Sequence, residues 1–357
     1  MTEKNSLQTR PHDIARKTYP VPPVQGKAVR DAEGRFLQMQ TEHLPSAITE
    51  ASPIDLWRWM ATRRKAKWPR QRRLKHKTDK PPERVTGDAV RVSWVGHSSC
   101  LVQLAGLNLL TDPVWSTRCS PLSFIGPKRV TPPGIKPADL PPIDAILLSH
   151  GHYDHLDIPT LKWICESHSP IIYCGLGLAE LLKRHHVVAR DMIEMDWQDS
   201  TSHDLQDGQA QIHFLPARHW SSRGKPGDRN LTLWGAFAIQ HPQAGNIYFA
   251  GDTGFGPHFD WAGQQFGSFR LALLPIGAYE PRWFMHPQHI DAREAAEAYR
   301  RLNARYALGI HHSTFQLTDE GIDDPKNMLD LSRRRLSIGP EHFRTIDIGT
   351  AWEVPPQ

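Results

Sequence analysis

The sequence His150-Gly151-His152-Tyr153-Asp154-His155 follows directly on the apolar run of residues 143–149, which has the character of a buried strand. In an extended chain alternate side chains point to the same side, so the first two histidines can bind one ion. A turn after them lets the aspartate and the last histidine face a second ion nearby. Three imidazoles and a carboxylate suit Zn²⁺ better than Mg²⁺ or Ca²⁺. A solvated histidine-rich loop is the alternative interpretation.

Six residues do not complete two tetrahedral zinc sites, so further ligands must come from other parts of the chain. Three candidates follow short apolar runs: His219 after the run ending at Leu215, Asp252 after residues 247–250, and His311 after residues 307–310. Functional side chains gather at such transitions from strand to loop. Taken one at a time, each candidate is more often a surface histidine or a turn aspartate than a ligand.

The composition limits the class of protein. The chain has 357 residues, of which 39% are apolar and 20 are histidines, so we expect a sizeable buried core and consider metal binding. No stretch has the length and apolarity of a membrane span, and the first six residues lack the apolar core of a signal peptide. The four cysteines form no CxxC pair, which indicates reduced thiols in an intracellular protein. We therefore expect a cytoplasmic protein that contacts a membrane, if at all, from the cytoplasmic side.

The net charge of +5 is concentrated in residues 63–84, called here the basic segment. It holds eleven Lys and Arg residues against two acids, so the rest of the chain is mildly acidic. Three interpretations are open: a solvated linker, a contact with nucleic-acid phosphates, and an anchor on anionic lipid. Nearby Trp57, Trp59, Met60 and Trp68 favour the lipid anchor. Because the segment lacks the interleaved aromatic residues that stack on bases, we expect no nucleic-acid partner.

The region before the strands divides into a tail and a helix. Residues 1 to about 50 are polar without a sustained period, which predicts a tail or an extended arm that wraps the protein. Ser52 as N-cap and Pro53 at the first helical position predict a helix start. The apolar residues on one face of that helix are Ile54, Trp57 and Ala61. We divide the chain into an N-terminal extension, residues 1–84, and a catalytic domain, residues 85–357.

Short β-rich runs predict many strands after the basic segment. These runs cover residues 90–95, 101–104, 107–111, 143–149, 171–174, 212–215, 231–239, 247–250 and 271–275. Helical patterns lie between them. The clearest covers residues 293–302, with a capping box of Asp291 and Glu294 and a buried stripe that includes Ala295 and Ala296. Many strands with helices outside them predict either a layered αββα sandwich or a doubly wound sheet.

The order of the motifs resembles the metallo-β-lactamase superfamily of dinuclear metallohydrolases: the H-x-H-x-D-H loop, a single histidine, Gly251-Asp252-Thr253-Gly254 and a final histidine. The resemblance implies an α+β fold, the four-layer αββα sandwich. It implies that one Zn²⁺ is bound by His150, His152 and His219. It implies that a second Zn²⁺ is bound by Asp154, His155 and His311, with Asp252 bridging the two ions. The β-lactamases themselves have a cysteine ligand at the position of Asp252, so antibiotic hydrolysis is not expected.

Further motifs resemble one branch of that superfamily, the N-acylphosphatidylethanolamine-hydrolysing phospholipases D. They are Trp94-Val95-Gly96-His97, Leu110-Thr111-Asp112-Pro113, Gly126-Pro127-Lys128-Arg129, residues 140–145, and the eleven-residue run at 275–285, PIGAYEPRWFM. This resemblance covers about three quarters of the chain, from residue 90 onward. It implies hydrolysis of N-acylphosphatidylethanolamine or a similar phospholipid to N-acylethanolamine and phosphatidic acid. The nucleophile implied is a hydroxide held between two Zn²⁺ ions.

The same resemblance implies roles for residues beside the metals. Asp154 would also orient the hydroxide, and His289 would protonate the leaving oxygen or contact the phosphate; a structural histidine is the alternative for His289. Arg223 and Tyr153 are candidate substrate contacts, since an arginine offers two parallel donors to a phosphodiester.

Asp112 and His97 are expected to orient ligand imidazoles without binding a metal, because a ligating histidine usually donates its other N–H to a carboxylate or carbonyl. His312, which follows the last metal histidine, is not expected to be a ligand. Two alternatives to the phospholipase are a zinc hydrolase of a small soluble phosphodiester or lactone, and an RNA nuclease. A homodimer is one open expectation for the state of association.

Overall fold

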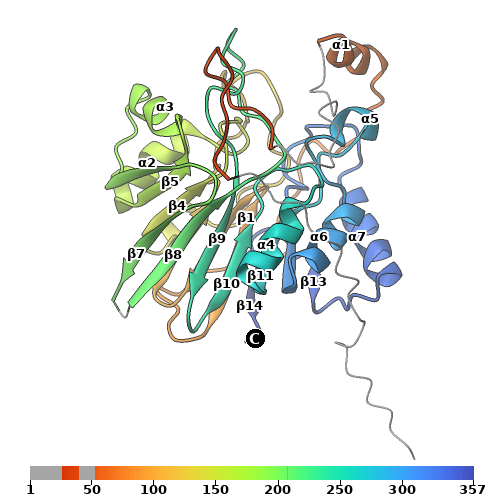
Figure 1. Ribbon diagram of the computed structural model, residues 1–357. Helices are drawn as coiled ribbons and strands as arrows, with labels where there is room; N and C mark the ends of the chain where they lie inside the picture. The colour runs from red at the N-terminus through yellow and green to blue at the C-terminus, as the bar shows by residue number, and fades with distance from the viewer. Residues whose placement is uncertain (1–25, 40–52, 207) are drawn as a thin grey trace, which may run out of the picture.

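The computed structural model describes residues 26–39, 53–206 and 208–357. Within these residues two seven-stranded sheets lie face to face, and helices cover both outer faces (Figure 1). This arrangement confirms the four-layer αββα sandwich and excludes the doubly wound sheet.

The two sheets repeat one pattern of strand pairing. The strands of the first sheet are β1 (Val90–Gly96), β2 (Ser99–Leu104), β3 (Leu107–Thr111), β4 (Ala145–Leu148), β5 (Ile171–Gly175), β6 (Asp191–Met195) and β14 (Ala351–Val354), in the order β14-β1-β2-β3-β4-β5-β6. The strands of the second are β7 (Asp199–Leu205), β8 (Gly208–Leu215), β9 (Ala236–His241), β10 (Gly245–Phe249), β11 (Phe269–Pro275), β12 (Ala304–Ile310) and β13 (Phe343–Arg344), in the order β13-β12-β11-β10-β9-β8-β7. Starting from β14 or from β7, each sheet has three antiparallel pairs and then three parallel pairs. The repeat was not evident from the sequence.

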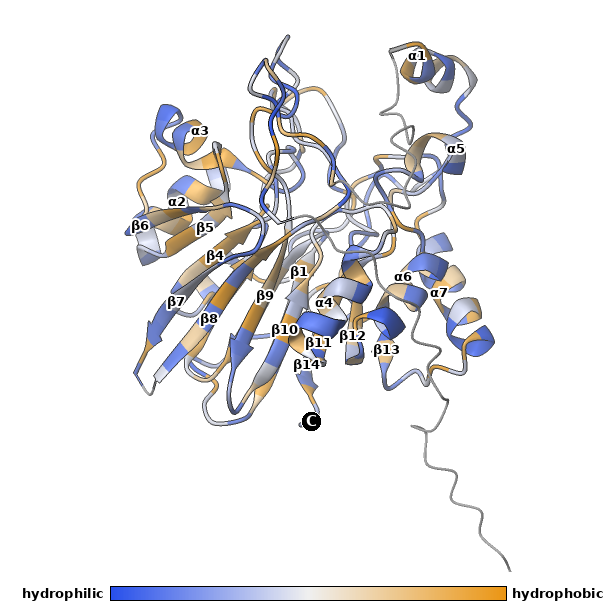
Figure 2. Ribbon diagram, in the orientation of Figure 1, coloured by the Kyte–Doolittle hydropathy of each residue, from blue (hydrophilic) through white to orange (hydrophobic). Residues whose placement is uncertain are grey.

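Helices cover the outer face of each sheet. The first sheet is covered by α2 (Ile158–His168) and α3 (Leu178–Arg184), and the second by α4 (His258–Phe266), α6 (Ala292–Arg301) and α7 (Asp324–Arg335). Two short helices lie outside these layers, α5 (Arg282–Met285) and the 3-10 helix η1 (Pro137–Asp139). Figure 2 shows the strands as mostly apolar and the helices as mixed in hydropathy.

Alternation along the strands produces three layers of buried side chains. In β4, Ala145 and Leu147 lie between the two sheets, whereas Ile146 and Leu148 pack against the outer helices. The strand therefore buries both faces and has no polar alternation. Trp94 of β1 is also fully buried between the sheets, and a buried side chain of this kind stabilises the fold by about 1.5–3 kcal/mol.

Several predicted elements need correction at their ends. The run 143–149 forms a strand only at Ala145–Leu148, and the prediction of a strand at 231–235 is wrong because β9 begins at Ala236. The amides of Leu233 and Gly235 instead donate to carbonyls of the first sheet's loops, at Leu176 and Ser149. The helix predicted at 293–302 is α6, and its capping box of Asp291 and Glu294 is present.

The predicted N-terminal helix is α1 (Pro53–Thr62), and its predicted N-cap, Ser52, lies outside the described residues. The predicted apolar face is turned to solvent, with Ile54 75% and Trp57 71% exposed. The helix packs through Trp59 instead, whose ring centroid is 4.9 Å from that of Phe284 in α5. Among the described residues no helix has the length and apolarity needed to cross a bilayer.

The basic segment lies against the domain and pairs with its carboxylates. Its ion pairs join Arg63 to Asp319, Arg72 to Asp323, Lys75 to Asp347, Lys80 to Asp139 and Arg84 to Asp144. Ahead of it, Phe36 is buried in the core between the sheets. These contacts direct much of the positive charge toward the protein itself. The division between residues 84 and 85 stays a prediction.

Candidate metal centre

The seven residues predicted as ligands lie together where the two sheets present the carboxyl ends of their strands. They follow β4 (His150, His152, Asp154 and His155), β8 (His219), β10 (Asp252) and β12 (His311). Strands β8, β10 and β12 run in one direction, so their following loops share one edge, which is where functional groups gather in such folds. Gly251 permits a close approach between two of these loops: a Cβ there would lie 2.6 Å from Ser149 Cβ.

His150, His152 and His219 form the first group. His152 Nδ1 lies 2.8 Å from His150 Nε2 and 3.2 Å from His219 Nε2. The other ring nitrogen of His219, Nδ1, donates to the Gln288 carbonyl at 3.0 Å. His150 Nδ1 donates to Ser149 Oγ at 2.9 Å, because that hydroxyl donates its own proton onward. The Nε2 atoms of His150 and His219 therefore face inward with lone pairs, an arrangement that suits a bound cation.

Burial keeps these three imidazoles neutral. It holds the pKa values of His150 and His219 well below the usual value for histidine, and it lowers the pKa of His152 to about 4. The surrounding imidazoles disfavour charge on His150 further. Since metal binding requires the neutral ring, the first group is ready to bind without losing a proton.

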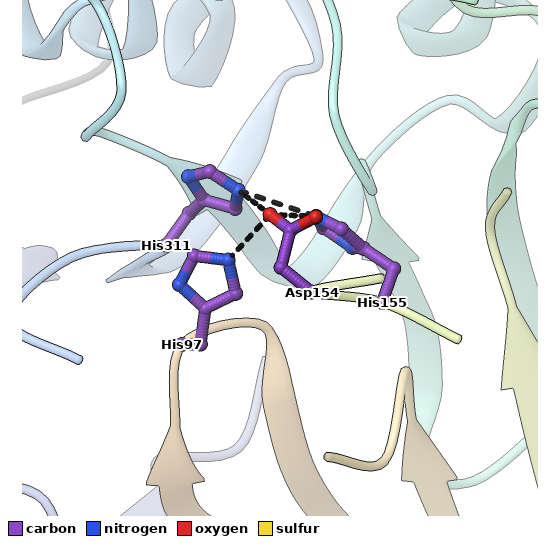
Figure 3. Close-up of side chains that lie close together, drawn as sticks. All are labelled: His97, Asp154, His155 and His311. Carbon is purple, nitrogen blue, oxygen red and sulfur yellow. Dashed lines mark hydrogen bonds and ion pairs between the residues drawn. The ribbon is translucent and has the colours of Figure 1, made fainter. Parts of the chain in front are cut away.

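Asp154, His155 and His311 form the second group, together with His97 (Figure 3). His155 Nε2 lies 3.2 Å from His311 Nε2, and Asp154 Oδ2 lies 3.4 Å from the former and 3.5 Å from the latter. Asp252 reaches both groups: its carboxylate lies 3.1 Å from His311 Nε2, 3.2 Å from His155 Nε2 and 3.9 Å from His219 Nε2. The carboxylate thus occupies the intermediate position that a bridging ligand requires.

The second group contains the carboxylates, and its predicted ligand histidines, His155 and His311, have raised pKa values where the histidines of the first group have lowered ones. Burial disfavours charge on His311, but Asp252 and Asp154 outweigh it and raise the pKa of His311 to about 9. The same competition between burial and carboxylates raises the pKa of His155 well above its usual value. Burial alone would raise the pKa values of Asp154 and Asp252, and the neighbouring imidazoles instead hold both well below the usual range. The donor set of this group, imidazole with carboxylate, fits a divalent cation.

Four non-glycine residues around the centre have a left-handed backbone: His97 (φ 55°), Asp112 (φ 33°), Ala278 (φ 62°) and His311 (φ 64°). Such residues cost about 1–3 kcal/mol each and concentrate at functional sites. Hydrogen bonds hold them in place. The amide of His97 donates to Thr314 Oγ1 at 2.7 Å, and that of Ala278 donates to Glu320 Oε1 at 2.7 Å. The fold thus stabilises a strained frame around the metal centre.

Asp112 and His97 contact the centre differently. Asp112 is fully buried and accepts from His155 Nδ1 at 2.6 Å and from the Ser149 hydroxyl at 2.6 Å, so it orients predicted ligands of both groups. His97 Nε2 lies 3.0 Å from Asp154 Oδ2, a carboxylate and not an imidazole as expected. His312 is buried against Trp94, at 4.6 Å between ring centroids.

Two groups that orient the predicted ligands His150 and His219 were not foreseen, the Ser149 hydroxyl and the Gln288 carbonyl. For Ser149 a signal existed, because it stands between the strand and His150. A backbone carbonyl 69 residues away from His219 carries no signal in the sequence.

The residues predicted to meet substrate differ in position. His289 lines the cavity described below, with Nδ1 3.7 Å from Asp252 Oδ2, and burial lowers the pKa of His289 to about 4. Tyr153 lines the same cavity. Arg223 is buried and is not among the residues that line the cavity. Its Nη1 donates to the carbonyls of Gly151 and Leu156 at 3.0 and 2.7 Å. The Arg223 guanidinium also lies over the Tyr153 ring at 3.6 Å, so it braces the metal-binding loop. Its contact with substrate stays a prediction.

A cavity of about 370 Å³ extends from the metal centre to α1 and α5. Its polar wall includes His152, Tyr153, Asp154, Arg229, Gln288, His289 and Thr318. Its apolar wall includes Leu56 and Trp59 of α1, Phe284 and Met285 of α5, and Leu317. The cavity therefore offers a polar surface beside the metal ligands and a hydrocarbon surface beside the N-terminal helix.

Comparisons with known proteins agree with this architecture. A family model described as "Beta-lactamase superfamily domain" matches residues 107–312. An N-acyl-phosphatidylethanolamine-hydrolyzing phospholipase D 1 from Caenorhabditis elegans is 39% identical over 73% of this chain and 75% of its own length. A mitochondrial N-acyl-phosphatidylethanolamine-hydrolyzing phospholipase D from Saccharomyces cerevisiae is 33% identical over 67% of this chain and 51% of its own. Among solved structures, an isothiocyanate hydrolase from Delia radicum gut bacteria is 18% identical and has a TM-score of 0.58 over 73% of this chain and 98% of its own.

Proposed function

We propose that this chain is a zinc phosphodiesterase of phospholipase D type. It belongs to the metallo-β-lactamase superfamily, in the branch of the N-acylphosphatidylethanolamine-hydrolysing phospholipases D, and is thus a metal-dependent hydrolase. Its substrate would be N-acylphosphatidylethanolamine or a similar phospholipid, cleaved to N-acylethanolamine and phosphatidic acid. The observation that carries this proposal is the cavity, which joins the metal centre to an apolar wall on α1 and α5.

Seven side chains would hold two Zn²⁺ ions. His150, His152 and His219 would bind one ion, Asp154, His155 and His311 the other, and Asp252 would bridge them; these residues lie in the two groups described above. When bound, the ions supply Lewis-acid charge to the phosphate oxygens and lower the pKa of water toward neutrality.

The surrounding residues fix the ligands and the substrate. His97 holds the Asp154 carboxylate at 3.0 Å and so fixes its orientation, in which Asp154 would ligate a metal and direct the attacking water at phosphorus. The bond that breaks joins phosphorus to the ethanolamine oxygen, and the leaving alkoxide must gain a proton. His289 has a buried Nδ1 that no protein atom hydrogen-bonds within the described structure, and it lines the cavity. We assign it to the phosphate or to the leaving oxygen.

The cavity wall favours an amphiphile over a small soluble ester. A phosphodiester group suits the polar wall beside His152 and Asp154, and acyl chains suit the wall formed by α1 and α5. Apolar contacts far from the reacting atoms supply binding energy that a small ester cannot obtain. Because members of one superfamily share a site while their substrates vary, hydrolysis of a small phosphodiester or lactone is the alternative to test.

We also propose that α1 rests on a membrane surface. Ile54, Trp57 and Met60 are exposed on this helix, and Trp283 of α5 is half exposed beside it. Aromatic and aliphatic side chains of this kind enter the headgroup region. The ion pairs of the basic segment with the domain make these apolar residues, and not its cations, the main contact. A cytoplasmic location belongs to the same proposal; the yeast relative is named as mitochondrial.

The proposal is tested by measuring bound metal and products with purified protein. We expect two Zn²⁺ per chain by elemental analysis and release of N-acylethanolamine from N-acylphosphatidylethanolamine vesicles by mass spectrometry. A parallel panel of soluble phosphodiesters and lactones gives the comparison. Faster turnover of a soluble ester than of the lipid would replace the phospholipase assignment by the alternative.

A further inference from the structure

The loop after β8, which carries His219, is held by a part of the chain far from it in sequence. Its Arg218 carbonyl accepts from the Gly254 amide at 2.7 Å, in the neighbouring loop after β10 of the same sheet. The His219 carbonyl accepts instead from the side-chain amide of Gln38, 181 residues earlier in the chain. Because a carbonyl only accepts hydrogen bonds, the group of Gln38 that faces it is the NH₂ group. The backbone at a predicted metal ligand is thus tied to the segment 26–39.

Gln38 lies in a segment that is itself anchored in the protein. The side chains of Phe36 and Met39, close to Gln38 on either side, are buried in the core between the two sheets. The Phe36 amide donates to the Asn230 carbonyl at 2.7 Å. The segment 26–39, red in Figure 1, therefore lies along the loop after β8 in a defined position. Gln38 thus reaches His219 from a backbone that is held in place.

His219 depends on this support because of where it lies in the fold. His150 and His152 lie on one loop after β4 of the first sheet, whereas His219 follows β8 of the second. The His219 ring is oriented by the Gln288 carbonyl, which accepts from Nδ1 at 3.0 Å. The Gln38 contact fixes the backbone of the same residue, so the two contacts together determine where Nε2 lies. Zinc sites hold their nitrogen ligands at about 2.0–2.1 Å, which leaves little room for a displaced ligand.

We propose that Gln38 is a positioning residue of the metal centre, which holds the His219 backbone so that its ring reaches the ion shared with His150 and His152. This inference rests on the proposed function for the presence of Zn²⁺. Groups that orient a metal ligand typically change metal affinity by about 10- to 100-fold. The segment 26–39 therefore belongs to the metal centre in function, although the sequence places it in the N-terminal extension.

The test compares Gln38→Met and Gln38→Glu with the wild type. Both new side chains have nearly the length of glutamine and lack its N–H donor. Gln209→Met is the matched control, because Gln209 is exposed and donates to Asp204 in the hairpin of β7 and β8. The measurement is the affinity for each of the two Zn²⁺ ions, by competition with a chelator. His219→Ala identifies which of the two affinities belongs to the first group, and thermal melting without metal checks that each variant is folded.

We expect both Gln38 variants to lower the affinity of the first group for Zn²⁺ by roughly 10- to 100-fold and to leave that of the second group close to the wild type. Gln209→Met should change neither affinity. Equal losses at the two groups would mean that Gln38 stabilises the fold as a whole and, like the absence of any loss, would overturn the inference. A wild type whose zinc affinity depends on Gln38 but which releases no N-acylethanolamine would overturn the proposed function and leave the inference standing. A wild type that binds no Zn²⁺ would overturn both.

Discussion

The metal centre is rich in histidine and the basic segment is rich in Lys and Arg, and the two differ in what their side chains face. In the centre the ligand atoms of His150, His152 and His219 converge, while the hydrogens on the outer nitrogens of His150 and His219 go to protein acceptors. In the basic segment several cations point toward carboxylates, as in the pairs of Arg63 with Asp319 and Arg84 with Asp144.

This difference indicates that the metal centre serves the chemistry of the protein and that the basic segment serves the packing of its chain. Buried imidazoles and carboxylates whose ligand atoms converge are suited to share a cation. Charges that each have a partner on the same protein require nothing further and contribute little individually. An unusual composition is therefore a sign of function where the ligand atoms of several such side chains converge on one point, as they do in the metal centre.

The largest effect expected is from Asp252→Asn, which removes the carboxylate that reaches both ligand groups. Bound cations are worth several kcal/mol to a phosphoryl transition state, so kcat/KM should fall by roughly 1000-fold or more. Asp347→Asn is the matched change in a carboxylate that pairs with the basic segment, and it should leave zinc content and turnover near the wild type. Elemental analysis and hydrolysis assays measure both. Full activity of Asp252→Asn would contradict the assignment.

A smaller loss of metal affinity is expected from Asp112→Asn. Asp112 orients His155 directly and His150 through Ser149, and losing such a supporting group typically lowers metal affinity by about 10- to 100-fold. Competition with a chelator measures the change. Asp139→Asn, which removes a partner of Lys80, provides the control. If both variants bound zinc equally well, Asp112 would have no orienting role.

Asp319→Ala tests whether the basic segment reaches the cavity through α1. Asp319 accepts from Trp59 Nε1 at 2.9 Å and from Arg63 Nε at 3.0 Å, and Trp59 lines the cavity. Losing these partly buried bonds should lower the free energy of unfolding by about 1–3 kcal/mol. It should also raise KM for a phospholipid more than KM for a soluble phosphodiester. Chemical denaturation and vesicle assays check this, and unchanged lipid KM would separate α1 from substrate binding.

The smallest effect is expected from Lys80→Gln. The Lys80 side chain is 73% exposed and its ammonium lies 3.5 Å from Asp139. Exposed pairs of this kind contribute about 0.2–1 kcal/mol, so thermal melting should change by little. A large loss of stability, or of lipid binding, would mean that single cations of the basic segment act beyond this pairing.

The sequence predicted the site better than the surroundings of the site. The seven candidate ligands, which the structure brings together, could be placed at one site because each follows an apolar strand, as His219 follows β8 and His311 follows β12, and because their order matches a known family. The partners of the basic segment could not, since Asp319 and Asp347 lie far along the chain and ion pairing depends on the folded structure alone. The buried side of α1 was missed for the same reason: Trp59 is buried against Phe284 and Met285, which lie more than 200 residues further along the chain.

Strand β14 has a consequence for synthesis of the protein. It pairs with β1 and forms one edge of the first sheet, although β1 is made early and β14 late. A ribosome-bound chain therefore exposes the open edge of β1 until residues 351–354 have emerged, and an unpaired edge invites association with other strands. His311 emerges late as well, so the second ligand group becomes complete only shortly before that edge closes. The second group of candidate ligands and the closed edge of β1 thus both depend on chain that is synthesised after residue 310.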